Sequence, residues 1–122
     1  MALAKLGVIV LDCPDPHALA DFYAAVIGGT PKGGDEGWVD LEGHGGTALA
    51  FQEAPGHTPP AWPDAAHSQQ FHLDLTVERE ALDEVEAKVL ALGATALDAA
   101  DRTRSWRVYA DPAGHPFCLC AC

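Results

Sequence analysis

The clearest pattern of apolar and polar positions covers residues 70–77, Gln-Phe-His-Leu-Asp-Leu-Thr-Val, where the two kinds alternate. A period of two is typical of a strand with one buried face and one polar face. The polar face of this predicted strand carries His72, Asp74 and Thr76. If the protein has a reactive or binding centre, we expect that face to belong to it.

Apolar residues at helical spacing predict two amphipathic helices. In the first, Asp15 suits the N-cap, Pro16 suits the first helical position, and Gly28-Gly29 ends the helix. The second runs from Arg79 to about Leu92 and stops at Gly93. The apolar stripe of the first helix consists of Leu19, Phe22, Tyr23 and Val26.

Short runs between turn residues predict the remaining strands. Thr30–Gly37 is a Gly-rich turn region with room for a weak strand. Ala54–Ser68 carries four prolines, and repeated prolines exclude regular pairing, so we interpret it as a linker or lid loop. The other predicted strands are Leu6–Leu11, Trp38–Glu42, Thr47–Glu53, Ala94–Leu97, Trp106–Ala110 and His115–Cys122.

The two halves of the chain match each other. A shift of 65 residues carries Val8 onto Leu73, and a shift of 68 carries Trp38 onto Trp106. Each half is predicted to form a strand, a helix and then strands joined by tight turns. A repeat of this length is a signal of the fold, because two half-covered sheets can join edge to edge and curve around a shared face.

Several short motifs fall within this repeated pattern. They are Leu11-Asp12-Cys13 before Asp15-Pro16, Leu19-Ala20-Asp21-Phe22-Tyr23, Phe71-His72-Leu73-Asp74-Leu75, Leu92-Gly93-Ala94-Thr95, and Asp111-Pro112-Ala113-Gly114-His115-Pro116-Phe117-Cys118. Through them the chain resembles the vicinal oxygen chelate superfamily, and most closely its small glyoxalase-like branch. That superfamily includes glyoxalases, bleomycin-resistance proteins, fosfomycin-resistance enzymes and extradiol dioxygenases.

The resemblance covers nearly the whole chain and implies an α+β fold. Two βαβββ modules in tandem would form a curved mixed sheet with a concave cleft. We expect a single domain over residues 1–122, with module one at about 4–54, the proline-rich loop at 55–68 and module two at about 69–121. Because fold does not imply reaction, the substrate stays open.

The resemblance also implies positions for a divalent metal. Carried over strand by strand, the usual ligands of catalytic members fall on Gly7, Ala50, His72 and Cys118. Only His72 keeps a usual ligand, and a thiolate is not the hard carboxylate that magnesium, manganese or iron(II) prefers. We therefore expect no cofactor. If a divalent metal binds at all, His72 and Cys118 are the expected ligands.

The formal net charge is −11, with 18 acidic residues against 7 Lys and Arg. Such a chain should repel nucleic acid and anionic membranes, so neither is an expected partner. The apolar run near the N-terminus, Leu6 to Leu11, is shorter than a signal-peptide core. We expect a cytoplasmic protein whose cysteines stay reduced.

His72 and Asp74 are the candidate catalytic pair, acting as base and assistant, although an ordinary polar strand face would look the same. Cys118 and Cys120 could form a soft-metal site with His72, or be buried thiols. Trp38, Trp106, Phe51 and Tyr109 could wall a pocket or simply pack. Arg102, Arg104 and Arg107 could hold an anion or form a solvated surface. The predicted ligand-binding set is Trp38, Phe51, Gln52, His72, Asp74, Trp106, Cys118 and Cys120.

Two functions fit these features. One is a metal-free binder that sequesters a small organic ligand, in the manner of bleomycin-resistance proteins. The other is a lyase, isomerase or dioxygenase-like enzyme acting on a small oxygenated metabolite, with His72 as base or metal ligand. A non-catalytic interaction domain is a lesser alternative. The resemblance further implies a homodimer.

Overall fold

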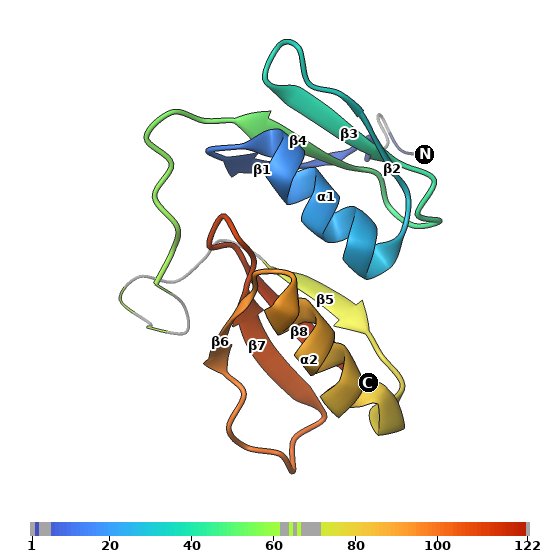
Figure 1. The fold of residues 1–122 in the computed structure, drawn as a ribbon, viewed down its shortest axis with the longest axis vertical. Helices are drawn as coiled ribbons and strands as arrows, with labels where there is room; N and C mark the ends of the chain where they lie inside the picture. Colours follow the sequence, from blue (N-terminus) through green and yellow to red (C-terminus); the bar gives the residue numbers. More distant parts are fainter. Residues whose placement is uncertain (1, 3–5, 62–63, 65, 67–71, 122) are drawn as a thin grey trace. The chain divides into compact units, whose positions relative to one another are not determined.

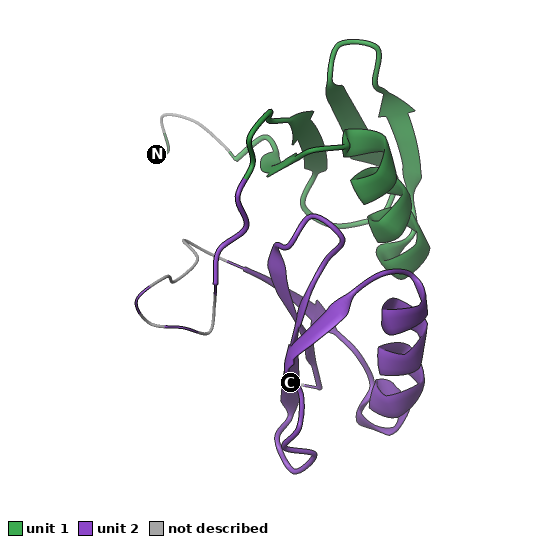
Figure 2. Ribbon diagram, turned by 60° about the vertical axis from the view of Figure 1, so that its left-hand side comes forward, with its two compact units in different colours: residues 1–57 green, residues 58–122 purple. Residues whose placement is uncertain are grey.

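The computed structural model describes residues 2, 6–61, 64, 66 and 72–121 (Figure 1). The chain forms two compact units, residues 1–57 and 58–122 (Figure 2). Each unit packs one α-helix against one four-stranded mixed sheet. The predicted α+β fold of two tandem strand–helix–strand modules is therefore confirmed.

Unit 1 has strand order β1-β4-β3-β2, with β1 parallel to β4 and the other pairs antiparallel. The predicted first strand is displaced by two to three residues, and the Gly-rich turn region does hold a short strand. The elements are β1 (Ile9–Cys13), α1 (Pro16–Ile27), β2 (Thr30–Gly33), β3 (Trp38–Glu42) and β4 (Leu49–Glu53).

Local capping sets the ends of α1, as predicted. The Asp15 carboxylate accepts a hydrogen bond from the backbone N–H of Ala18 at 3.1 Å, and Pro16 occupies the first helical position. At the other end Gly28 adopts a φ of 88°, a conformation that favours glycine. The helix thus starts and stops for reasons contained in its own sequence.

The core of unit 1 lies between α1 and its sheet. The ring of Tyr23 stacks on that of Phe51, with centroids 5.7 Å apart and planes 10° apart. Both side chains are fully buried. Phe51 therefore faces α1 and packs in the core, which does not support its predicted role as a ligand contact.

Unit 2 has strand order β5-β8-β7-β6, with β5 parallel to β8. Of the strand predicted over 70–77, Gln70 and Phe71 lie outside the described residues. The predicted helix 79–92 is a 3₁₀ turn followed by an α-helix. The elements are β5 (Leu73–Thr76), η2 (Arg79–Ala81), α2 (Leu82–Ala91), β6 (Thr95–Asp98), β7 (Trp106–Ala110) and β8 (Pro116–Cys120). None of the helices in the described residues combines the length and apolar character that a membrane span requires.

One face of the unit 2 sheet packs against α2. Tyr109 stacks on Phe117, with centroids 5.6 Å apart, and its hydroxyl donates to Glu86 of α2 at 2.5 Å. Arg107 also pairs with Glu86, at 3.6 Å. Because side chains alternate along a strand, Trp106, Val108 and Cys118 lie on the opposite face. We call the face of each sheet that points away from its own helix the far face.

The strand pairing corrects the register of the internal repeat. In unit 1 Val10 lies opposite Ala50, and in unit 2 Asp74 lies opposite Cys118. The shift of 68 that carries Ala50 onto Cys118 holds, but Val10 matches Asp74 at a shift of 64, not 65. A one-residue slip exchanges the two faces of a strand. The counterpart of His72 in unit 1 is therefore Val8 instead of Gly7, and neither side chain has a ligand atom.

Candidate functional site

The far face of unit 2 brings three polar side chains together. Asp74 on β5 lies opposite Cys118 on β8, and the Nε2 atom of His72 lies 3.1 Å from Oδ1 of Asp74. Ligand atoms of His72, Asp74 and Cys118 all lie within 4.8 Å of one another. Backbone positions two apart on a strand are about 7 Å from each other, so the side chains close this distance by turning inward.

The surroundings of Cys118 keep its thiol protonated. Burial, followed by the neighbouring Asp74 carboxylate, raises the pKa of the Cys118 thiol to about 12, against an opposing effect of Arg104. Cys118 is a free cysteine. At neutral pH it is therefore a hydrogen-bond donor beside the His72–Asp74 pair.

Arg104 and Trp106 line the edge of the same face. The Arg104 guanidinium lies 4.7 Å from the centre of the Trp106 ring. It also binds the Asp98 carboxylate, at 3.1 and 3.2 Å, and the Asp98 carbonyl at 2.8 Å. The Trp106 side chain is partly exposed, at 42%. The sequence named Arg104 as a possible anion ligand but did not place it here, and it did not indicate Asp98, because a loop outside the repeat pattern positions the arginine.

Cys120 does not supply a thiol. It follows Cys118 on the same face, as predicted, and lies opposite Trp106. However, Cys120 is disulfide-bonded. This corrects the expectation that the cysteines stay reduced, and it excludes the alternative in which Cys120 joins His72 and Cys118 as a metal ligand. Cys122 lies outside the described residues.

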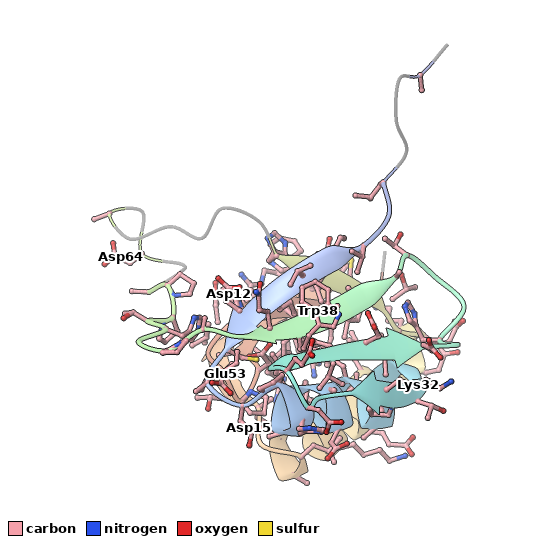
Figure 3. All side chains as sticks on the ribbon, turned by 90° about the horizontal axis from the view of Figure 1, so that it is seen from above. Asp12, Asp15, Lys32, Trp38, Glu53 and Asp64 are labelled. Carbon is pink, nitrogen blue, oxygen red and sulfur yellow. The ribbon has the colours of Figure 1, made fainter. Side chains whose placement is uncertain are left out.

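The other predicted ligand contacts belong to unit 1. Trp38 lies opposite Gln52, and Gln52 opposite Asp12, so all three share the far face of that sheet. Figure 3 shows Asp12 and Trp38 on this face. The Trp38 indole N–H donates to Asp40 at 3.0 Å, which fixes the ring along its own strand. Gln52 is exposed.

The three grouped side chains of unit 2 fit one class of metal ion. An imidazole, a carboxylate and a thiolate together suit zinc, whose catalytic sites have three protein ligands and an open position. They suit magnesium or manganese less well, because those ions prefer oxygen ligands. His72, Asp74 and Cys118 would hold the ion, so Asp74 joins the two residues, His72 and Cys118, that were expected as ligands if a metal binds.

The sequence model of the glyoxalase-like domain family matches residues 8–120, and the chain belongs to this family. No curated protein sequence matches the chain.

Solved structures show the same fold. A glyoxalase/bleomycin resistance/dioxygenase family enzyme from Burkholderia phytofirmans PsJN superposes with a TM-score of 0.74 at 21% identity, covering 95% of this chain and 97% of that one. A mutant fosfomycin resistance protein from Listeria monocytogenes, complexed with Mn(II) and a dihydroxypropylphosphonic acid, gives a TM-score of 0.70 at 16% identity. That match covers 99% of this chain and 91% of the other. Hypothetical protein SA1046 from S. aureus gives 0.70 at 19% identity, covering 100% and 95%. At these identities the likeness concerns the fold.

Proposed function

We propose that this chain binds a small, oxygen-rich organic molecule on the far face of unit 2, with His72, Asp74 and Cys118 as its polar centre. The observation that carries the proposal is the convergence of their ligand atoms within 4.8 Å. A strand face that serves only for packing does not require polar groups at one point. Converging polar groups are typical of a small-molecule site.

The chemistry of the site defines the ligand. His72 and the Cys118 thiol offer hydrogen bonds, while the Asp74 carboxylate accepts them. Trp106 offers a flat, partly exposed ring beside the cluster. The Asp74 carboxylate and the net charge of −11 favour a neutral or cationic molecule here, whereas Asp98 is already paired with Arg104. Sequestering such a ligand without reaction is the function we put first.

A zinc-dependent enzyme is the second candidate, because the same three atoms form a plausible donor set. A bound zinc ion would polarise a substrate oxygen. His72, Asp74 and Cys118 would hold the ion. In a metal-free version, His72 would accept the proton from a substrate, and the Asp74 carboxylate at 3.1 Å would orient and stabilise the resulting imidazolium.

Metal content separates the two candidates. The chain would be purified without chelator, dialysed against mixed divalent metals and measured by elemental mass spectrometry, beside His72→Ala. His17→Ala is the matched control, because His17 is an exposed histidine of unit 1. About one equivalent of zinc in the wild type and control, lost in His72→Ala, would establish the metal site and overturn the metal-free binder.

If none of the three proteins retains metal, the binder stands and is tested by a thermal-shift screen of neutral and cationic aromatic molecules. A ligand that stabilises the wild type and is recovered unchanged, but fails to stabilise His72→Ala, supports sequestration. A product that forms only with intact His72 supports the metal-free enzyme. A ligand that stabilises both proteins equally would exclude the His72 site.

Homodimer formation and a cytoplasmic location stay predictions. The dimer rests on the resemblance and on partly exposed apolar side chains in unit 2, namely Leu90, Leu92 and Leu97. Light scattering at high micromolar concentration tests it, and a monomer under those conditions would contradict it.

A further inference from the structure

All four arginines of the chain line one cavity of unit 2. The cavity has a volume of about 400 Å³ and lies between η2, the first turns of α2 and the loop that leads into β7. The described lysines, Lys32 and Lys88, do not line it. In a protein with a net charge of −11, this gathering of guanidinium groups calls for an explanation. The charged lining residues are Arg79, Arg102, Arg104, Arg107, Asp83 and Glu86.

Two of the arginines have structural partners. Arg102 binds Glu86 through two hydrogen bonds of 2.7 and 2.8 Å, and Glu86 also accepts the Tyr109 hydroxyl. Arg104 binds Asp98 and lies over Trp106. These contacts fasten the loop between β6 and β7, and they occupy the Glu86 carboxylate.

Arg107 is less well compensated. Its side chain is only 5% exposed, yet its nearest carboxylate, Asp83 at 2.9 Å, has a side chain that is 85% exposed. The already occupied Glu86 lies 3.6 Å away. The Nε and Nη1 atoms of Arg107 are buried without a hydrogen-bond partner. A buried charge normally has close, well-ordered partners, because desolvation is costly.

Arg79 is the fourth guanidinium of the lining. It forms no ion pair with any described residue, and it is exposed at the mouth of the cavity on η2. The first turn of α2 reaches the same cavity through Leu82 and Asp83, so the positive end of the helix dipole adds to the field there. The lining carries four guanidinium groups against two carboxylates.

We propose that this cavity binds the oxyanion of a small molecule, a phosphate or carboxylate group, through Arg107 and Arg79. The anion takes the place of the exposed Asp83 carboxylate on Nη2 of Arg107, and Asp83 rotates into solvent. Guanidinium groups suit this task because their planar donors match both kinds of oxyanion. Asp83 thereby acts as a competitor built into the site. Arg104 lines this cavity and also reaches the edge of the face that carries His72, Asp74 and Cys118. The proposed anion ligands, Arg107 and Arg79, do not belong to that cluster, so the inference does not depend on the proposed function.

The test titrates inorganic phosphate and, separately, succinate into the full-length chain, with sodium chloride at matched ionic strength as the reference. Binding is followed by calorimetry and by the rise in melting temperature, which grows with ligand concentration when only the folded state binds. We expect saturable binding of at least one of the two anions. Binding of one alone identifies the preferred oxyanion, and both results support the site.

Three variants make the test specific. Arg79→Gln should weaken anion binding about threefold to tenfold, since one charge-assisted contact at a partly exposed site is lost. Asp83→Asn should strengthen it several-fold by removing the competitor. Lys88→Gln is the matched control, because Lys88 is an exposed cation of the same helix that pairs with Glu84 outside the cavity.

The proposal fails if neither anion binds saturably. It also fails if Arg79→Gln and Lys88→Gln weaken binding equally, because that result would show a general charge effect. Unchanged or weaker binding by Asp83→Asn would refute the competitor role. Circular dichroism of each variant checks that the fold is retained, and all three positions are exposed enough for this to be expected.

Discussion

The hydroxyl of Tyr109 donates a hydrogen bond of 2.5 Å to Glu86, which fixes β7 to α2 within unit 2. The same carboxylate receives two hydrogen bonds from Arg102. Glu86 is thus a partly buried junction between the helix, the sheet and the loop between β6 and β7. Its charge should contribute directly to the stability of the fold.

Glu86→Gln should remove a stabilisation that depends on pH. The hydrogen bonds from Arg102, followed by the one from Tyr109, lower the pKa of Glu86 from 4.5 to about 2. A lowered folded-state pKa stabilises the protein above pH 4.5, and this contribution is lost as the pH falls toward 2. We expect Glu86→Gln to lower the free energy of unfolding by about 2 kcal/mol at pH 7, after allowance for solvent screening.

Urea unfolding between pH 3 and pH 7 measures this effect. The wild type and Glu86→Gln should converge as the pH falls below 4.5, because protonation then neutralises Glu86 in the wild type, while the glutamine of the variant is neutral at every pH. Glu84→Gln serves as the control, since Glu84 is an exposed residue of the same helix that pairs with Lys88. If Glu86→Gln lowers the free energy of unfolding by the same amount at every pH, the shape of the side chain, and not its charge, accounts for the stabilisation.

Tyr109→Phe should destabilise unit 2 by about 1–3 kcal/mol, because it removes a donor from a charged acceptor while keeping the ring. The stack on Phe117 remains intact in the variant. Its effect should be much smaller in the Glu86→Gln background, since the two residues share one interaction. A double-mutant cycle measured by urea unfolding checks this, and additive effects would contradict the coupling.

Local signals in the sequence were sufficient for the helices and most strands. Asp15, Pro16 and Gly28 fix the ends of α1 through contacts within a few residues. The register of β1 was harder, because the run from Leu6 to Leu11 is apolar on both faces and alternation cannot orient it. Only the pairing of Val10 with Ala50 fixes which side faces α1.

The candidate site was predictable where it depends on strand alternation. His72 and Asp74 share a face because they are two residues apart, and Cys118 joins them because β8 pairs with β5. The same rule excludes Phe51 once Gln52 is placed on the far face, since adjacent residues point to opposite sides. Strand alternation says nothing about the disulfide state of Cys120, and Arg104 lies in the loop between β6 and β7, which has no periodic pattern. The sequence therefore revealed neither.

If zinc binds, Cys118→Ser should lower its affinity by at least about tenfold, because a hydroxyl replaces the soft thiolate ligand. Cys120→Ser should leave the affinity nearly unchanged, since Cys120 is disulfide-bonded and supplies no thiolate. Comparing the two variants distinguishes loss of a zinc ligand from a general effect of replacing cysteine, because both residues lie on the same face of β8. Competition with a chromogenic chelator measures the affinities, and an equal loss in both variants would exclude the set of His72, Asp74 and Cys118.

Gly28 and Gly29 form a matched pair for testing the end of α1. Both have a positive φ, 88° and 95°, so alanine at either position costs about 1–2 kcal/mol in backbone strain. A methyl group at Gly29 would lie 2.7 Å from the carbonyl oxygen of Glu42. A methyl group at Gly28 would meet none of the described atoms beyond its chain neighbours within 4 Å. Gly29→Ala should therefore lower the free energy of unfolding clearly more than Gly28→Ala, by roughly a further 1 kcal/mol or more. Urea denaturation of the two variants compares them directly. Equal costs would mean that β2 and β3 move apart to admit the methyl group, and that the close approach of Gly29 to Glu42 adds little to the stability of unit 1.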